Sequence, residues 1–218
     1  MRFAAGLGHR LRERGPAAMP NISPLLQKGA LLVLDPTTGI PLNTIRFQYN
    51  PETIKRSLQP QSVGDQPDRT EVLRLKGPAI ETIHCDIELD ATDALAASDP
   101  TAMSLGIAPQ LAVIELLVYP SSSILIANEV LSLVGTIEIL PMSSNLTVFA
   151  WGPNRVTPVR LTGIEISEEQ FDPKLNPIRA KLTLSMRVLN VNDVGFLTPA
   201  GALYMAYQMN KESLAGRA

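Results

Sequence analysis

The sequence has little of the chemistry on which most enzymes and metal proteins depend. Its 218 residues include one cysteine, Cys85, and two histidines, His9 and His84. A single cysteine excludes an internal disulfide framework, and two histidines so far apart in the chain do not suggest a metal site. P-loop, dinucleotide-binding and nucleophile-elbow motifs are also missing from the sequence. We therefore expect no catalytic residues, no cofactor and no metal.

Charges are few and nearly balanced. Lys and Arg number 19 against 21 Asp and Glu, which gives a formal net charge of −2. Such a chain has no electrostatic basis for binding nucleic acid or an anionic membrane. The length suits one large domain or two small ones, and a hydrophobic fraction of 45% is enough for a substantial core. The scarcity of cysteine favours folding in a reducing compartment, and hence assembly in the cytoplasm.

The N-terminal residues differ from the rest of the chain. Arginines dominate residues 1–18, and the apolar stretch Phe3–Leu7 is too short for a signal-peptide core. We predict that residues 1–22 are a disordered arm or a misassigned start, with Met19 as the alternative initiator, in preference to a functional basic tail. Residues 23–218 then form one domain that ends in a helix.

Residues 111–134 are strongly apolar, yet they do not suggest a membrane span. Glu115, Pro120 and Glu129 interrupt the run together with several serines, whereas a spanning helix needs about 20 mostly apolar residues. The pattern predicts a soluble helix, a break and a second short element. We therefore expect no direct membrane insertion.

Most of the remaining chain has the alternation of β-strands. Residues 83–90 alternate apolar and polar side chains with period two, with Cys85 on the apolar side and His84 on the wet side. Because strands do not alternate regularly with helices, we predict a mainly β, antiparallel sandwich or barrel with flanking helices. Further predictions are strands at 31–34, 45–49, 72–76, 136–140 and 146–151, a loop at 58–69, and a helix over 199–215 with Leu203, Ala206, Tyr207 and Leu214 on one side.

The longest predicted feature is a β-hairpin within residues 151–189. Val159 and Leu161 stand at odd positions, whereas Ile164 and Ile166 stand at even positions, which would point to the opposite face of a regular strand. A β-bulge at Gly163 is therefore predicted to reset the register. The connection FDPKLNPIRA has two prolines and an asparagine, which favour a rigid turn. Exposed strand edges can pair with the edges of another chain. The hairpin therefore indicates assembly.

Acidic residues near the hairpin turn leave a remote alternative. Glu165, Glu168, Glu169 and Asp172 could supply the paired carboxylates of a hydrolase. No partner base or nucleophile is identifiable beside them. We favour a solvated strand end over a catalytic site and expect that the protein is not an enzyme.

Several motifs, taken in order, resemble one family. They are IRFQYNPETIKRSLQPQ, LRLKGPAIETIHCDIELDATD, GIAPQLAVIELLVYP, VFAWGPNRVTPVRLTGIEISEEQFDPKLNPIRAKLTLSMRVL and the terminal KESLA. From about Leu25 to Ala215 they are similar to the tube-like baseplate proteins of extracellular contractile injection systems. These phage-tail-like particles include the Photorhabdus virulence cassette and the antifeeding prophage. The specific signal is the combination of FQYNPET, a Trp-Gly-Pro turn and FDPKLNPIRA.

This resemblance implies a tail-tube fold that assembles as a ring, expected to be six-fold, around a channel. Some relatives carry a LysM module after this domain; we expect none in this protein, and hence no peptidoglycan binding. The resemblance also implies that hairpins of neighbouring subunits join into a sheet lining the channel. Residues 156–166 and 178–189 are the expected contributors.

The implied function is a structural baseplate component that initiates or adapts the inner tube next to the spike or hub. The alternative is the repetitive inner-tube protein of the same particle, which can be released from the cell. Expected partners are further copies of the chain, the inner tube protein, the spike or hub protein and other baseplate proteins. Residues expected at the subunit interface are Trp151, Val159, Leu161, Ile164, Ile166, Phe171, Asp172, Asn176, Arg179, Lys181, Thr183, Ser185 and Arg187.

Overall fold

The computed structural model describes residues 27–62, 74–133 and 144–218. The predicted N-terminal arm, the predicted strand at 136–140 and residues 63–69 of the loop predicted at 58–69 lie outside the described residues. The strands are β1 (Ala30–Leu34), β2 (Pro41–Arg46), β3 (Ile54–Ser62), β4 (Leu75–Asp90), β5 (Leu146–Ala150), β6 (Val156–Phe171) and β7 (Pro177–Val188). The helices are α1 (Thr92–Ala96), α2 (Pro100–Leu105), α3 (Ala108–Glu115), α4 (Ser122–Leu133), α5 (Val191–Val194) and α6 (Pro199–Ala215).

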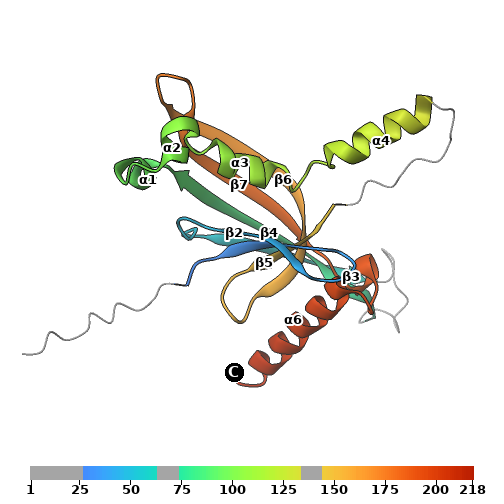
Figure 1. The fold of residues 1–218 in the computed structure, drawn as a ribbon. Helices are drawn as coiled ribbons and strands as arrows, with labels where there is room; N and C mark the ends of the chain where they lie inside the picture. The colour runs from blue at the N-terminus through green and yellow to red at the C-terminus, as the bar shows by residue number, and fades with distance from the viewer. Residues whose placement is uncertain (1–26, 63–73, 134–143) are drawn as a thin grey trace, which may run out of the picture.

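The fold is mainly β with flanking helices, as predicted from the sequence. Seven strands form one sheet in the order β2-β1-β5-β6-β7-β4-β3, and every pairing is antiparallel (Figure 1). Just after β2, the Gln48 side-chain amide donates to the carbonyl of Asp90 over 2.7 Å and accepts from its N–H over 2.9 Å. Since β2 and β4 lie near opposite ends of the strand order, the sheet curls on itself in a barrel-like way.

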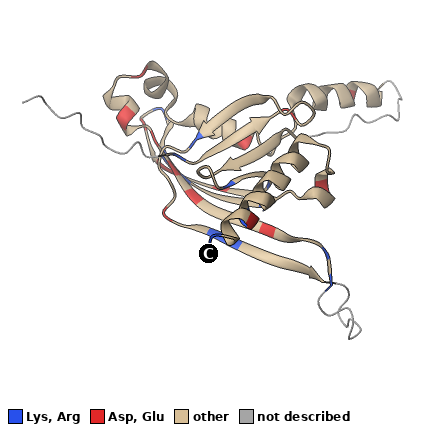
Figure 2. Cartoon of the chain, turned by 90° about the horizontal axis from the view of Figure 1, so that it is seen from below, with Lys and Arg blue, Asp and Glu red and all other residues tan. Residues whose placement is uncertain are grey.

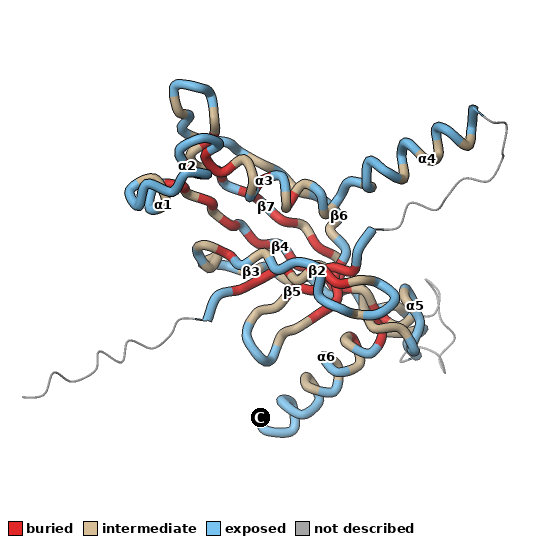
Figure 3. Tube along the Cα trace, in the orientation of Figure 1, coloured by how far each residue is buried: buried red, intermediate tan, exposed pale blue. Residues whose placement is uncertain are grey.

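The core lies on the inner face of this curled sheet. In β4 and β7 the alternation predicted from the sequence is confirmed, and Cys85 pairs with Leu184 with both side chains buried. Burial raises the pKa of the Cys85 thiol to about 12, so this thiol is a core group. Figure 3 shows the buried residues gathered along the long strands. The core also contains Leu31, Phe47, Ile83, Ile87, Leu111, Ile114, Phe149, Leu182, Met186 and Val188.

The C-terminal helix was predicted correctly in extent, and two residues of its predicted side, Leu203 and Tyr207, pack against the subunit. Thr198 caps α6 by accepting a hydrogen bond from the N–H of Gly201 over 3.1 Å. Tyr204 and Tyr207 are the buried aromatic residues of this helix, whereas Ala206 and Leu214 are exposed. The helix therefore meets the sheet through its tyrosines.

Three strands differ from the prediction. The strand predicted at 72–76 overlaps the start of the longer β4, and no strand was predicted at 54–57, where β3 begins. β2 ends at Arg46, and Phe47 turns inward, where its N–H donates to the carbonyl of Gly29 over 2.9 Å. β3 continues through Gln59 to Ser62, where a loop was predicted, because it pairs with β4. Pro60 falls at a register shift within that pairing, a position that a proline can occupy in a strand.

The break predicted within residues 111–134 separates α3 from α4. Within the described ranges, no helix combines the length and the apolar character needed to cross a membrane.

Candidate functional site: the open hairpin edge

The hairpin of β6 and β7 extends well beyond the strand beside it. β6 pairs with β7 from Val159 to Phe171, but β5 pairs with β6 only from Val156 to Val159. Among the described residues, the outer edge of β6 from 160 to 171 therefore has no strand partner. Such an edge presents a row of backbone N–H and C=O groups that can pair with another chain.

The predicted β-bulge lies within this free segment. Leu161 pairs with Met186 and Gly163 pairs with Ser185, so Thr162 is the additional residue of β6. The shift puts Ile164 opposite Leu184, so the isoleucines of the outer segment join the face that packs on the core. Without it, their side chains would point to the polar face.

A network of hydrogen bonds makes the hairpin turn rigid. The Asp172 carboxylate accepts from the N–H of Lys174 over 2.7 Å and from the N–H and side-chain amide of Asn176 over 2.8 Å each. These hydrogen bonds hold the pKa of Asp172 below its usual value, and the two from Asn176 have a larger effect than the one from Lys174. Asn176 also donates to the carbonyl of Ser104 in α2 over 3.0 Å. The turn is thus fixed to a helix of its own subunit.

The junction between α2 and α3 clamps the base of the turn. Ile107 donates its N–H to the carbonyl of Pro177 over 2.9 Å. The preceding Gly106 has φ +58°, and a Cβ at this position would come within 2.1 Å of the same carbonyl oxygen. Only glycine therefore allows this close approach.

The opposite face of the hairpin is polar and rich in charge. It is formed by the outward side chains of β4, β7 and β6, and Figure 2 marks the charged positions along the strands. Thr183 donates to Asp86 over 2.8 Å, and Lys181 forms an ion pair with Glu169 over 3.1 Å. The acidic side chains exceed the basic ones in this part of the face: Asp86, Glu88, Asp90, Glu165 and Glu169 oppose Arg179 and Lys181.

The residues expected at the interface fall into three environments. Polar outward positions are held by Arg179, Lys181, Thr183, Ser185 and Arg187. The side chains of Leu161, Ile164 and Ile166 are half-buried against the core of the subunit, and Val159 is buried. At the turn lie Asp172, Asn176 and Phe171, the last being 51% exposed.

Trp151 does not lie on the hairpin surface. Its ring stacks on Phe149 with centroids 6.2 Å apart and packs against the core of its own subunit. A Cβ added at Gly29 would come within 2.6 Å of the Trp151 ring. The tryptophan therefore belongs to the subunit's own core packing.

The four acids of the hydrolase alternative do not converge. Glu165 and Glu169 point to the polar face. Glu168 pairs with Ala180 and so stands at a position of the opposite, core-facing side of β6. Asp172 accepts hydrogen bonds within the turn. Glu169 is already paired with Lys181. Within the described part of the chain, no group of three or more His, Cys, Asp or Glu residues could hold a metal ion.

Sequence reasoning missed a buried ionic cluster centred on Glu81 of β4. The Glu81 side chain is 4% exposed and lies 2.6 Å from the Arg56 guanidinium and 3.5 Å from the Lys211 ammonium. Tyr207 donates to it over 3.1 Å. The cluster connects β3, β4 and α6, and no local sequence pattern reveals it because the partners come from distant parts of the chain.

No protein-family model matches the chain. A search of curated proteins finds no match.

Proposed function

We propose that the protein is a structural ring subunit of a contractile injection system baseplate, which initiates or adapts the inner tube next to the spike or hub. The observation that carries the proposal is the open outer edge of β6 from 160 to 171, on a hairpin whose turn is held rigid. The order of motifs quoted above supports the choice of particle. Backbone pairing needs no catalytic side chain.

A second free edge favours a ring over a two-fold dimer. β3 pairs with β4 alone among the described residues, so its outer edge from Ile54 to Ser62 is also open. When two different edges pair between subunits, the contact is head-to-tail, and such contacts form a ring where the rotation from one subunit to the next closes. The polar face with Lys181 and Thr183 then lines the channel, where water would solvate its charges.

The test uses proline at neighbouring positions of β6. Consecutive residues of a strand send their N–H groups to opposite sides, so one of Ser167→Pro and Glu168→Pro removes a bond to β7 and the other removes only an outward donor. The variant that keeps a wild-type circular dichroism spectrum should fail to enter particles. Normal particles from both variants would contradict the edge-pairing proposal.

Copy number separates the two candidate roles within the particle. An initiator or adaptor occurs in one ring, whereas an inner-tube protein occurs in many stacked rings. Quantitative mass spectrometry of purified particles should find this chain at the copy number of a single ring. A count that rises with tube length would identify it as the tube protein.

A further inference from the structure

The helix α4 extends away from the rest of the subunit. Figures 1 and 3 show it projecting from the end of α3, and none of its residues is buried. Yet several of its exposed side chains are large and apolar. Ile126 is 65% exposed, Val130 52% and Leu133 79%.

Such a helix needs a partner. Ile126, Val130 and Leu133 recur at i, i+4 and i+7, which makes one apolar stripe along the helix. Glu129 lies beside this stripe and is the single charged residue among the 12 of α4. An isolated helix of this length is marginal in water, and an exposed apolar stripe usually marks a contact surface.

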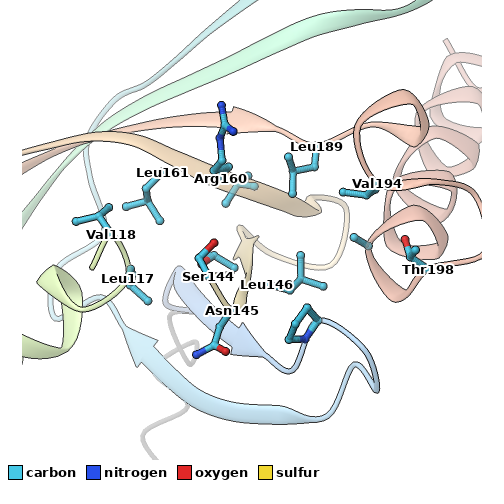
Figure 4. A pocket seen from close by; sticks show the side chains of 14 residues that line it. Leu117, Val118, Ser144, Asn145, Leu146, Arg160, Leu161, Leu189, Val194 and Thr198 are labelled. Atoms are coloured by element: carbon cyan, nitrogen blue, oxygen red, sulfur yellow. The ribbon is translucent and has the colours of Figure 1, made fainter. Parts of the chain in front are cut away.

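A groove of matching character begins beside the end of α3. It encloses about 460 Å³ between β5, β6, the end of α3 and the α5–α6 region (Figure 4). Apart from Arg160, the side chains that line it are uncharged, and Arg160 is exposed without an ion pair to any described residue. Its apolar lining includes Leu117, Leu146, Leu161, Leu189 and Val194.

We propose that α4 of one copy docks in this groove of a second copy, with Glu129 against Arg160. One apolar helix with a single negative charge thereby meets one apolar groove with a single positive charge. Exchange between copies is favoured over folding back because only Tyr119–Ser121 separates Val118, which lines the groove, from α4. Pro120 lacks an N–H and restricts Tyr119 to extended conformations, which directs α4 outward. This contact is a different one from the proposed edge pairing of β6, although both involve Arg160 and Leu161.

Crosslinking between two singly substituted proteins tests the proposal. Val130→Cys marks α4 and Ser144→Cys marks the rim of the groove, and both replacements are close in size to the original residue. The native Cys85 is buried, and its pKa is raised to about 12, so it does not compete for a maleimide. A mixture of the two proteins treated with a short bismaleimide should give a crosslinked heterodimer.

Three outcomes would overturn the exchange. Dimers of Val130→Cys alone would show that α4 pairs with another α4. An internal crosslink in a doubly substituted monomer would show that α4 folds back on its own groove. The absence of any crosslink between folded proteins would show that α4 does not dock there at all.

Charge reversal provides a second, independent readout. Glu129→Arg and Arg160→Glu should each lower the heterodimer yield about two- to fivefold, as expected for a partly exposed ion pair. Combining Glu129→Arg on the helix with Arg160→Glu on the groove should restore the yield. Glu52→Arg, which adds the same charge outside the groove, serves as the control. Failure of the combined variants to recover would contradict the pairing of Glu129 with Arg160.

Discussion

Tyr207 of α6 donates a hydrogen bond of 3.1 Å to the buried carboxylate of Glu81 in β4. Arg56 of β3 bonds to the same carboxylate oxygen over 2.8 Å and also donates to the Tyr207 hydroxyl over 2.9 Å. The three side chains thus form a closed triangle that holds the C-terminal helix to the edge of the sheet. Because the edge strand β3 is one of the two proposed contact edges, this cluster also fixes the geometry of assembly.

We predict that Tyr207→Phe lowers the free energy of unfolding by about 1.5 kcal/mol, since it removes a hydrogen bond to a charged group. Glu81→Gln should cost more, about 3 kcal/mol, because Arg56 then loses its counter-charge in a largely buried place. Urea unfolding of both variants checks the order. Equal stability of the two variants and the wild type would contradict the role assigned to the cluster.

The same tyrosine should give the wild type a specific loss of stability at alkaline pH. Burial, and then the charge of Glu81, raise the pKa of Tyr207 to about 12, whereas an unfolded tyrosine titrates near 10. The folded state therefore binds this proton more tightly than the unfolded state does. Its contribution is complete below about pH 10 and is lost as the pH rises toward 12. The stability difference between wild type and Tyr207→Phe should shrink over this range, and a constant difference would contradict the assignment.

Gly106→Ala should destabilise the base of the hairpin turn. The new Cβ would clash with the carbonyl of Pro177, and alanine is strained at φ +58°. We expect a loss of at least about 2 kcal/mol in thermal or urea unfolding. Gly163→Ala is the matched control, since its Cβ would meet nothing nearer than 3.8 Å. A larger loss in Gly163→Ala than in Gly106→Ala would reverse the interpretation.

Two aromatic residues should separate stability from assembly. Trp151→Ala should lower the free energy of unfolding by about 3 kcal/mol, because Trp151 stacks on Phe149 in the core region. Phe171→Ala should leave unfolding nearly unchanged, since its ring is 51% exposed, but it should weaken incorporation into particles. Thermal unfolding and particle yield measured on both variants check the pair. A melting temperature of Trp151→Ala equal to that of the wild type would contradict this prediction.

The alternation of residues predicted most of the long strands, and the failures have physical causes. The β-bulge could be predicted because the apolar residues change from odd positions, such as Leu161, to even positions, such as Ile164, within one strand. β3 could not be predicted, since its second half contains Gln59 and Pro60 and only pairing with β4 holds it in a strand.

The candidate site was predictable in part. That residues 159–188 form a hairpin followed from local patterns, but the pairing of Glu81 with Tyr207 joins residues 126 positions apart. The position of β7 within the sheet decides where a proline substitution is informative. Thr183 and Ser185 lie on a strand flanked by β4 and β6, so proline there would break the subunit itself. The outer segment of β6, which has no second strand partner among the described residues, is the informative place for a proline.

Hydrogen exchange at the backbone amides of β6 tests the central proposal most directly. In the isolated subunit, the residues from 160 to 171 should alternate between slow amides bonded to β7 and fast amides at the open edge. In assembled particles, the fast set should become protected, because a neighbouring strand takes up those donors. Fast exchange that persists in the particle at the same residues would contradict edge pairing and, with it, the proposed ring.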